Sequence, residues 1–286
     1  MLTLALSAVA LALPAVASGQ LRVDTTLYAS SGSCANCDLS DRRMNGMTLK
    51  NANFAGSVFN NSNLSGGTLH GSDLTGAHFR KAMLYGVRGE RVTLRGAVMR
   101  DATLTEANLS HSDMHRADFR RAELARGTFT ATDFREADLS GATARGADFT
   151  DAQFAGATLD GSDFTRAKLD RADLSGARFG TALMAEASIA GADLSGADLS
   201  LASGLDQRQL DSACGDAATR LPQGLSLPWC EGASDGHSTT MTASAAARLD
   251  AAIADIDAAL SGLPQSAART RIQRARDELV ESRSRL

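Results

Sequence analysis

Residues 137–176 read ADLSG ATARG ADFTD AQFAG ATLDG SDFTR AKLDR ADLSG when they are written in groups of five. Every group begins with a small residue, and all but one carry Leu or Phe in third place; the exception has Ala144 there. A period of five fits neither the 3.6-residue period of a helix nor the two-residue alternation of a strand. The chain is therefore interpreted first of all as a repeat protein.

The same register continues through 33 consecutive units, whose third places run from Leu39 to Leu199. These places hold sixteen Leu, ten Phe, four Met and one Ile, and the ten Phe are all that the chain has. Only Gly89 and Ala144 are not large and apolar, and the first place is small in 29 units. This pattern suits a chain that turns a corner every five residues. Four units would close a square coil, and successive coils would stack at about 4.8 Å.

The large residues are expected to point inward and to stack on the residue 20 positions away, which would form apolar ladders along the core. Burying one such side chain contributes roughly 1.5–3 kcal/mol. The ladder positions singled out are Leu39, Phe54, Phe59, Leu64, Leu74, Phe79, Leu104, Phe119, Phe134, Leu139, Phe149, Phe164, Leu174 and Leu194.

The unit Ala-Asp-Leu-x-x, as at Ala172-Asp173-Leu174, resembles the repeat of the pentapeptide-repeat family. The resemblance covers residues 37–201. It implies an all-β solenoid, a right-handed quadrilateral β-helix, whose length here corresponds to about eight coils at twenty residues each. The Asp, Asn and Thr that precede the large residue are interpreted as hydrogen-bonding partners of the local turn, not as a calcium site.

The first 17 residues (MLTLALSAVALALPAVA) carry no charge and end on a small-x-small cleavage pattern, Ala15-Val16-Ala17. We interpret them as a signal peptide, which predicts a periplasmic or secreted protein with no membrane span after cleavage. No Lys or Arg precedes the apolar run, and a buried N-terminal helix is the alternative interpretation. Residues 18–36 are expected to form an N-terminal cap on the first coil.

Export makes the four cysteines interpretable as structural disulfides. Cys34 and Cys37 flank the start of the repeats, whereas Cys214 and Cys230 follow their end. The rod would hold these pairs far apart, which predicts the pairings Cys34–Cys37 and Cys214–Cys230. A redox site at the first pair lacks the strand–helix context that such sites need, and a zinc site from all four would require the two ends of the rod to meet.

The residues after the repeats change character. Residues 202–231 leave the register and resemble the C-terminal caps of exported bacterial pentapeptide-repeat proteins, with a short helix expected around residues 207–213. Residues 232–240 have the composition of a linker. Residues 241–286 indicate a C-terminal α-helical extension, as a helical hairpin or amphipathic helices. Its apolar positions are Leu249, Ile253, Ile256, Leu260, Ile272, Leu279 and Leu286.

This extension has two possible roles. It packs on itself or on the rod, or its heptad-like seam supports a homodimer.

No catalytic, cofactor-binding or metal site is recognisable in the sequence. A net charge of −4 excludes a strongly basic nucleic-acid binder, and there is no phosphate-binding loop or nucleophile elbow. His111, Asp113 and His115 are close in sequence, but solvated surface residues are the favoured interpretation over a weak metal site.

One irregularity interrupts the repeat between Tyr85 and Val92. Gly89 occupies a core place, and Val87 and Val92 occupy small places, although the register is unchanged. We expect a distorted corner with a shallow dent there. It is either a binding site or a local repacking in which the two Val fill the space left by the glycine. The surface residues concerned are Tyr85, Arg88, Gly89 and Arg91.

These features favour a non-catalytic, exported scaffold that binds a protein partner of unknown identity. The alternative comes from the family: some cytosolic relatives resemble DNA and bind type II topoisomerases, which protects those enzymes from quinolones. The signal peptide and the nearly neutral repeat region, with 19 Lys and Arg against 21 Asp and Glu, count against that alternative.

Overall fold

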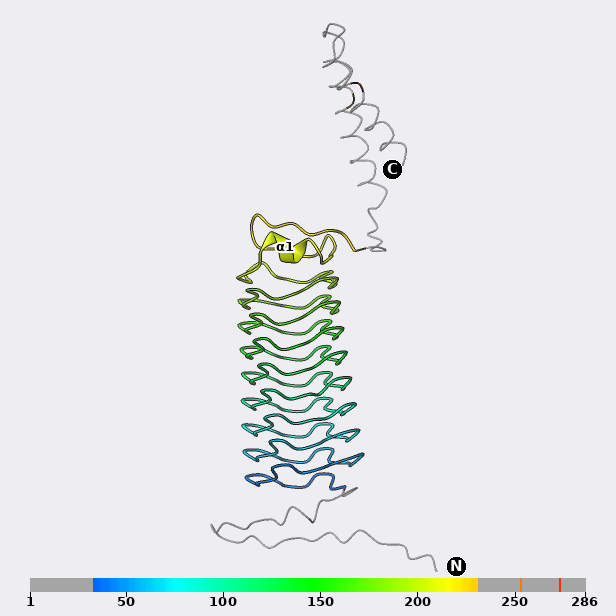
Figure 1. Ribbon diagram of the computed structural model, residues 1–286, viewed down its shortest axis with the longest axis vertical. Helices are drawn as coiled ribbons and strands as arrows, with labels where there is room; N and C mark the ends of the chain where they lie inside the picture. Colours follow the sequence, from blue (N-terminus) through cyan, green and yellow to red (C-terminus); the bar gives the residue numbers. More distant parts are fainter. Residues whose placement is uncertain (1–32, 231–252, 254–272, 274–286) are drawn as a thin grey trace, which may run out of the picture.

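The computed structural model describes residues 33–230, together with Ile253 and Gln273. Figure 1 shows the chain winding into a straight stack of square coils. Parallel β-bridges, from Asp38–Val58 to Leu183–Ser203, join residues that are 20 apart in sequence. Each coil therefore consists of four five-residue sides, and each side pairs with the same side of the coils before and after it. We number the coils from residue 37 in steps of 20.

The ladder positions lie in the core, as the inward-facing third place requires. All those singled out from the sequence are at most 2% exposed, except Leu39 in the first coil, which is half-buried. Phenylalanines 20 residues apart stack face to face: the ring centroids of Phe59 and Phe79 are 4.7 Å apart, and those of Phe134 and Phe154 are 4.9 Å apart. These separations equal the spacing between paired strands, so stacked rings fill successive coils without a gap.

The corners are β-turns with a positive φ at the residue two places after the large one. At one such corner, the N–H of Ala77 donates to the carbonyl of Leu74 (3.0 Å), and Gly76 has φ +65°. Eighteen non-glycine residues also adopt a positive φ, including Arg121 at +56° and Ala131 at +51°. The turn therefore imposes the left-handed conformation on whatever residue occupies this place, against its preference.

The Asp and Asn column supports these turns. The Asp73 carboxylate accepts a hydrogen bond from the N–H of Thr75 (2.9 Å), and Asp173 does the same for Ser175 (3.0 Å). Corresponding bonds recur at many units along the rod, for example at Asn63 and Asp138. This is the local turn hydrogen bonding that the sequence analysis assigns to the column.

The C-terminal end of the stack is covered by α1 (Gln207–Leu210) and the loop after it (Figure 1). The expected helix around residues 207–213 is thus shorter, a single turn. Asp206 caps it, with Gln209 completing a capping box. The Gln209 side-chain amide also donates to the carbonyls of Met184 (2.9 Å) and Ala187 (2.8 Å), and Leu210 is fully buried.

Several expected segments fall outside the described residues. These are the signal peptide (1–17), almost all of the N-terminal cap (18–36), the linker (232–240) and the C-terminal extension (241–286). Within the extension, Ile253 and Gln273 are described, and both have a helical backbone. Among the described residues, no helix combines the length and the apolar character that crossing a membrane requires.

The core ladders can be tested at Phe154, whose ring stacks on Phe134 and meets Phe149 edge-on. We expect Phe154→Ala to lower the free energy of unfolding by about 3–5 kcal/mol, because the rigid coils cannot collapse into the cavity. The matched control is Gln153→Ala at the exposed neighbouring place, which should stay within about 0.5 kcal/mol. Urea denaturation followed by circular dichroism measures both; equal losses would contradict the ladder.

The corners can be tested with opposite substitutions. Gly76→Ala should cost about 1 kcal/mol through its positive φ alone, since a Cβ there meets no atom within 4 Å. Ala131→Gly should relieve the same strain and stabilise the protein by up to about 1 kcal/mol. Thermal and urea unfolding of the two variants check the signs, and a stabilising Gly76→Ala would show that the turn imposes no strain.

Candidate functional site

The irregularity at Gly89 lies in the core of the third coil, residues 77–96. A Cβ built on Gly89 would lie 2.6 Å from Val92 Cγ2 and 3.1 Å from side-chain atoms of Leu69 and Leu109. These three side chains therefore occupy the space that a larger residue would need, and both Gly89 and Val92 are buried. Of the two valines expected to fill this space, Val92 does so, whereas Val87 is not among the nearest groups.

The corner that follows Gly89 departs from most others, as does the corner before Ala52, whose N–H donates to the hydroxyl of Ser72 (3.3 Å). The N–H of Val92 donates to the hydroxyl of Ser112 in the next coil (3.1 Å), where most corners close with a bond to the carbonyl of the large residue three places back. The backbone hydrogen bonds between coils continue here, because the N–H of Gly89 still donates to the carbonyl of Asn108 (2.7 Å).

Charge is concentrated on the same coil. Residues 77–96 carry five Lys and Arg and a single carboxylate, Glu90, for a net charge of +4. The coils before and after it, residues 57–76 and 97–116, each carry −1, and the remaining coils lie between −2 and +1. The near-neutral total of the repeat region conceals this positive belt.

Most Lys and Arg side chains of the later coils form an ion pair with an Asp or Glu that is 20 residues away in sequence. Examples are Arg121 with Asp101 (2.7 Å) and Arg171 with Asp151 (2.7 Å). In the third coil Arg95 also finds a partner, in Asp113. In contrast, the other four cations of that coil form no ion pair with any described residue: Arg80, Lys81, Arg88 and Arg91. All four side chains are exposed.

Two large apolar side chains lie exposed between these cations. Met83 is 45% exposed and Tyr85 is 47% exposed. The Tyr85 hydroxyl donates to Glu106 (2.5 Å), whose other oxygen accepts from Arg126 (2.9 Å). The bond to Glu106 raises the pKa of the Tyr85 hydroxyl, and the same bond lowers the pKa of Glu106. The phenol is therefore held in one orientation, with its ring open to solvent.

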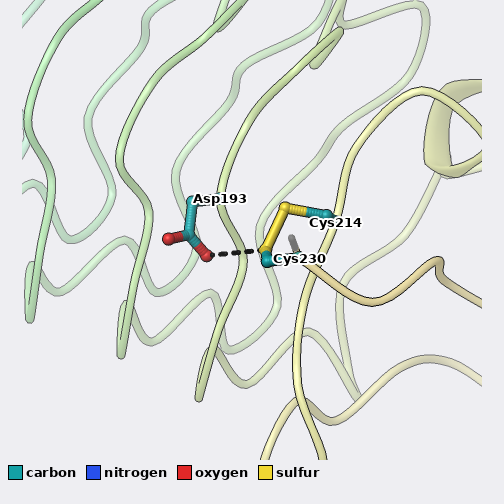
Figure 2. Close-up of side chains that lie close together, drawn as sticks. All are labelled: Asp193, Cys214 and Cys230. Atoms are coloured by element: carbon teal, nitrogen blue, oxygen red, sulfur yellow. Dashed lines mark hydrogen bonds between the residues drawn. A yellow bond between two sulfur atoms is a disulfide. The ribbon is translucent and has the colours of Figure 1, made fainter. Parts of the chain in front are cut away.

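The C-terminal cap contains a second cluster of chemically interesting groups. Figure 2 shows Asp193 beside Cys214 and Cys230, which form the only set of three possible metal ligands within the described residues. The two sulfurs are joined in a disulfide, with Cα atoms 4.7 Å apart, so neither offers a thiolate. The Asp193 carboxylate accepts a hydrogen bond from the N–H of Ser195 (2.8 Å), as Asp173 does from Ser175 at the same place of the preceding coil. This arrangement is that of a covalent clasp.

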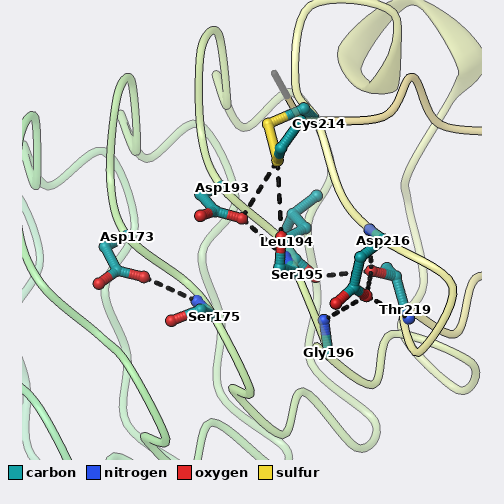
Figure 3. Close-up of a disulfide and its surroundings, with 10 residues drawn as sticks. Asp173, Ser175, Asp193, Leu194, Ser195, Gly196, Cys214, Asp216 and Thr219 are labelled. Carbon is teal, nitrogen blue, oxygen red and sulfur yellow. Dashed lines mark hydrogen bonds between the residues drawn. A yellow bond between two sulfur atoms is a disulfide. The ribbon is translucent and has the colours of Figure 1, made fainter. Parts of the chain in front are cut away.

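Asp216 fastens the cap to the last coil next to this disulfide (Figure 3). Its carboxylate accepts from the N–H of Gly196 (2.8 Å) and from Ala218 and Thr219 (3.0 Å each). The Thr219 hydroxyl donates to the carbonyl of Leu194 (2.9 Å). These donors, the Gly196 N–H above all, hold the pKa of Asp216 below its usual range.

The other predicted sites are placed as follows. Cys34 and Cys37 are joined in a disulfide at the start of the stack, with Cα atoms 5.6 Å apart. His111, Asp113 and His115 do not form a cluster of metal ligands in the described structure. A cleft of about 510 Å³ lies beside α1, lined by residues that include Glu186, Asp206 and Arg208, but Asp206 is used as the helix cap.

Two parts of the third-coil surface escaped the sequence analysis. Tyr85, Arg88 and Arg91 were singled out there, whereas Arg80, Lys81 and Met83 were not. Charge summed coil by coil, with a twenty-residue window in the repeat register, would have found the cations. The exposure of Met83 follows from its place next to a core residue in the repeat.

The hydrogen bonds of Asp216 between the cap and the last coil can be tested. Folding lowers the pKa of Asp216. The charged carboxylate therefore adds to the free energy of unfolding above the pKa of the unfolded state, and this addition is lost as pH falls through the pKa of the folded state. We expect Asp216→Asn, which keeps an acceptor oxygen and removes the charge, to melt below the unsubstituted protein at pH 7. The difference should shrink between about pH 4 and pH 2. Calorimetry at each pH measures it, and a difference independent of pH would contradict the assignment.

Comparison with known proteins places these features in context. A family model described as pentapeptide repeats matches eight times between residues 33 and 200. No curated protein matches the chain.

Among solved structures, the chain is similar to HetL, a pentapeptide repeat protein involved in heterocyst differentiation regulation in the cyanobacterium Nostoc sp. strain PCC 7120. The identity is 26%, the match covers 70% of this chain and 86% of HetL, and the TM-score is 0.39. A trypsin-treated variant of QnrB1, a plasmid-mediated fluoroquinolone resistance protein, is 21% identical over 68% of this chain and 91% of its own, with a TM-score of 0.36.

The family matches span more than half of the chain and coincide with the bridged coils. They confirm the resemblance seen in the sequence and give the solenoid its hand, that of a right-handed β-helix. The chain belongs to the pentapeptide repeat family.

Proposed function

We propose that this protein is a non-catalytic, exported scaffold whose rod binds a protein partner. The observation that carries the proposal is the third coil, where four unpaired cations surround exposed Met83 and Tyr85. Such a mixture of Arg, Met and Tyr is enriched in protein–protein interfaces. The rest of the rod supplies rigidity, since most of its large apolar side chains are buried in the core.

Export is supported by the apolar residues 1–17 and by the two cystine bridges that bind the first coil and the cap. The domain boundaries given above remain part of this proposal. So does the helical extension, residues 241–286, with self-association through its apolar seam. None of these assignments requires a cofactor.

The charge pattern gives no support to a topoisomerase-binding DNA mimic. A mimic of duplex DNA presents rows of negative charge along its length. Here the first five coils, residues 37–136, together carry a positive charge of +3, and the strongest local charge is the positive belt of the third coil.

The exported state can be tested by expressing the full chain and separating the cell compartments. We expect the mature protein outside the cytosol, with Ser18 at its N-terminus and no thiol available to alkylation before reduction. Edman sequencing and mass spectrometry after alkylation provide the two readouts. An intact Met1 in the cytosol, together with four free thiols, would contradict export and both disulfides.

A further inference from the structure

We propose that the third coil binds an acidic, extended segment of a protein partner, which crosses the rod perpendicular to its axis. This inference rests on the interaction role proposed above and specifies the chemistry of the partner. It concerns the surface formed by Arg80, Lys81, Met83, Tyr85, Arg88 and Arg91, which we call the third-coil belt.

The sign of the partner's charge follows from the belt. The four cations have no carboxylate partner among the described residues. The carboxylate of Asp101 in the following coil is already bound to Arg121, and that bond lowers its pKa. Arg80 and Lys81 are close enough to help lower the same pKa. Unpaired guanidinium groups bind carboxylates through two parallel hydrogen bonds, and this geometry gives specificity as well as attraction.

The order of residues along the coil gives the pattern of the partner. Arg80 and Lys81 stand at one corner, Met83 lies on the next side and Tyr85 at the corner that ends it. Arg88 lies on the side after that. A segment following this path would meet cations, then apolar groups, then cations again. We therefore expect carboxylates that flank one or two apolar residues, with the Tyr85 ring as an anchor.

The height of the belt favours a polypeptide over a membrane or a nucleic acid. The net charge of +4 is confined to one coil, about 4.8 Å high, and both adjacent coils carry −1. A planar anionic membrane would lie along one side of several coils. A nucleic acid would bring rows of phosphates onto the negatively charged coils. A single extended chain has the height of one coil and touches the cations alone.

The backbone of the same coil supports a functional role. Gly89 interrupts the column of large core residues, and its place is filled by the side chain of Val92. Departures from the local rules of a fold are expected where function constrains the sequence. In the third coil, the core residue and the surface charge depart together.

The experiment is site-specific photocrosslinking in cells that produce the full chain. Met83→benzoylphenylalanine places the crosslinker in the belt. Leu183→benzoylphenylalanine is the matched control, because Leu183 is 42% exposed at the same place of the same side, five coils further on. Mass spectrometry then identifies the attached molecule and the crosslinked segment.

We expect the Met83 variant to capture a protein through a segment with net negative charge, and the Leu183 variant not to capture it. Arg80→Glu with Arg88→Glu should lower the yield at least about tenfold. Arg43→Glu with Lys50→Glu changes the net charge by the same amount on the first coil and should leave the yield unchanged. Both pairs of residues are exposed, so their circular dichroism should match that of the parent.

The inference would be overturned if the Met83 variant captured no protein, or captured only lipid or nucleic acid. It would also be overturned if the crosslinked segment carried no net negative charge, or if both double variants lowered the crosslinking yield equally. The compartment of the captured protein separates this inference from the proposed function. A cytosolic partner that crosslinks through an acidic segment would refute export and leave the belt assignment standing. Conversely, an exported protein that gives no crosslink would support export and refute the belt assignment.

Discussion

The structure depends on one steric constraint, the narrow square interior of the coil. Each side directs a large residue inward, and the residue two places before it also faces inward, directly after the preceding corner. The space there suits a small side chain, and most of these places hold a fully buried Ala, although Val87 and Val92 are also accommodated. At several places that hold Ser or Thr, the hydroxyl donates to a carbonyl: Ser62 to Phe59 (2.6 Å) and Thr132 to Leu109 (3.0 Å). The interior thus admits polar atoms only when they have a partner.

The same constraint explains why the fold could be predicted from the sequence. A buried side chain in a square coil has neighbours fixed by number, 5 and 20 residues away, so the core could be assigned without tertiary information. The assignment weakens at Leu39, which is half-buried because its coil is the first of the stack. It also weakens at α1, where the chain leaves the register and the bridge from Asp198 to Arg220 spans 22 residues.

The candidate site was only partly predictable. Gly89 and its neighbours stood out because they break the core pattern, and a break in a periodic sequence is visible. Arg80 and Lys81 did not, because the outward places of the repeat in this chain hold many kinds of polar residue, so a cation there breaks no pattern. What distinguishes them is that no carboxylate one coil away is left to pair with them: Asp101 lies one coil from Lys81, but it is bound to Arg121. That distinction is a property of neighbours in space, and it becomes visible only when the coils are aligned.

The twenty-residue register also limits how such a rod can change during evolution. Inserting twenty residues would lengthen the stack by one step and leave each surface facing the same direction. Inserting five would turn everything downstream by a quarter revolution, and a single extra residue would disrupt the coil. Tyr85 and Trp229 of the cap are both exposed. The angle about the rod axis that separates the directions they face is therefore restricted to discrete values. A partner that touches both would select among whole units of sequence, not among single residues.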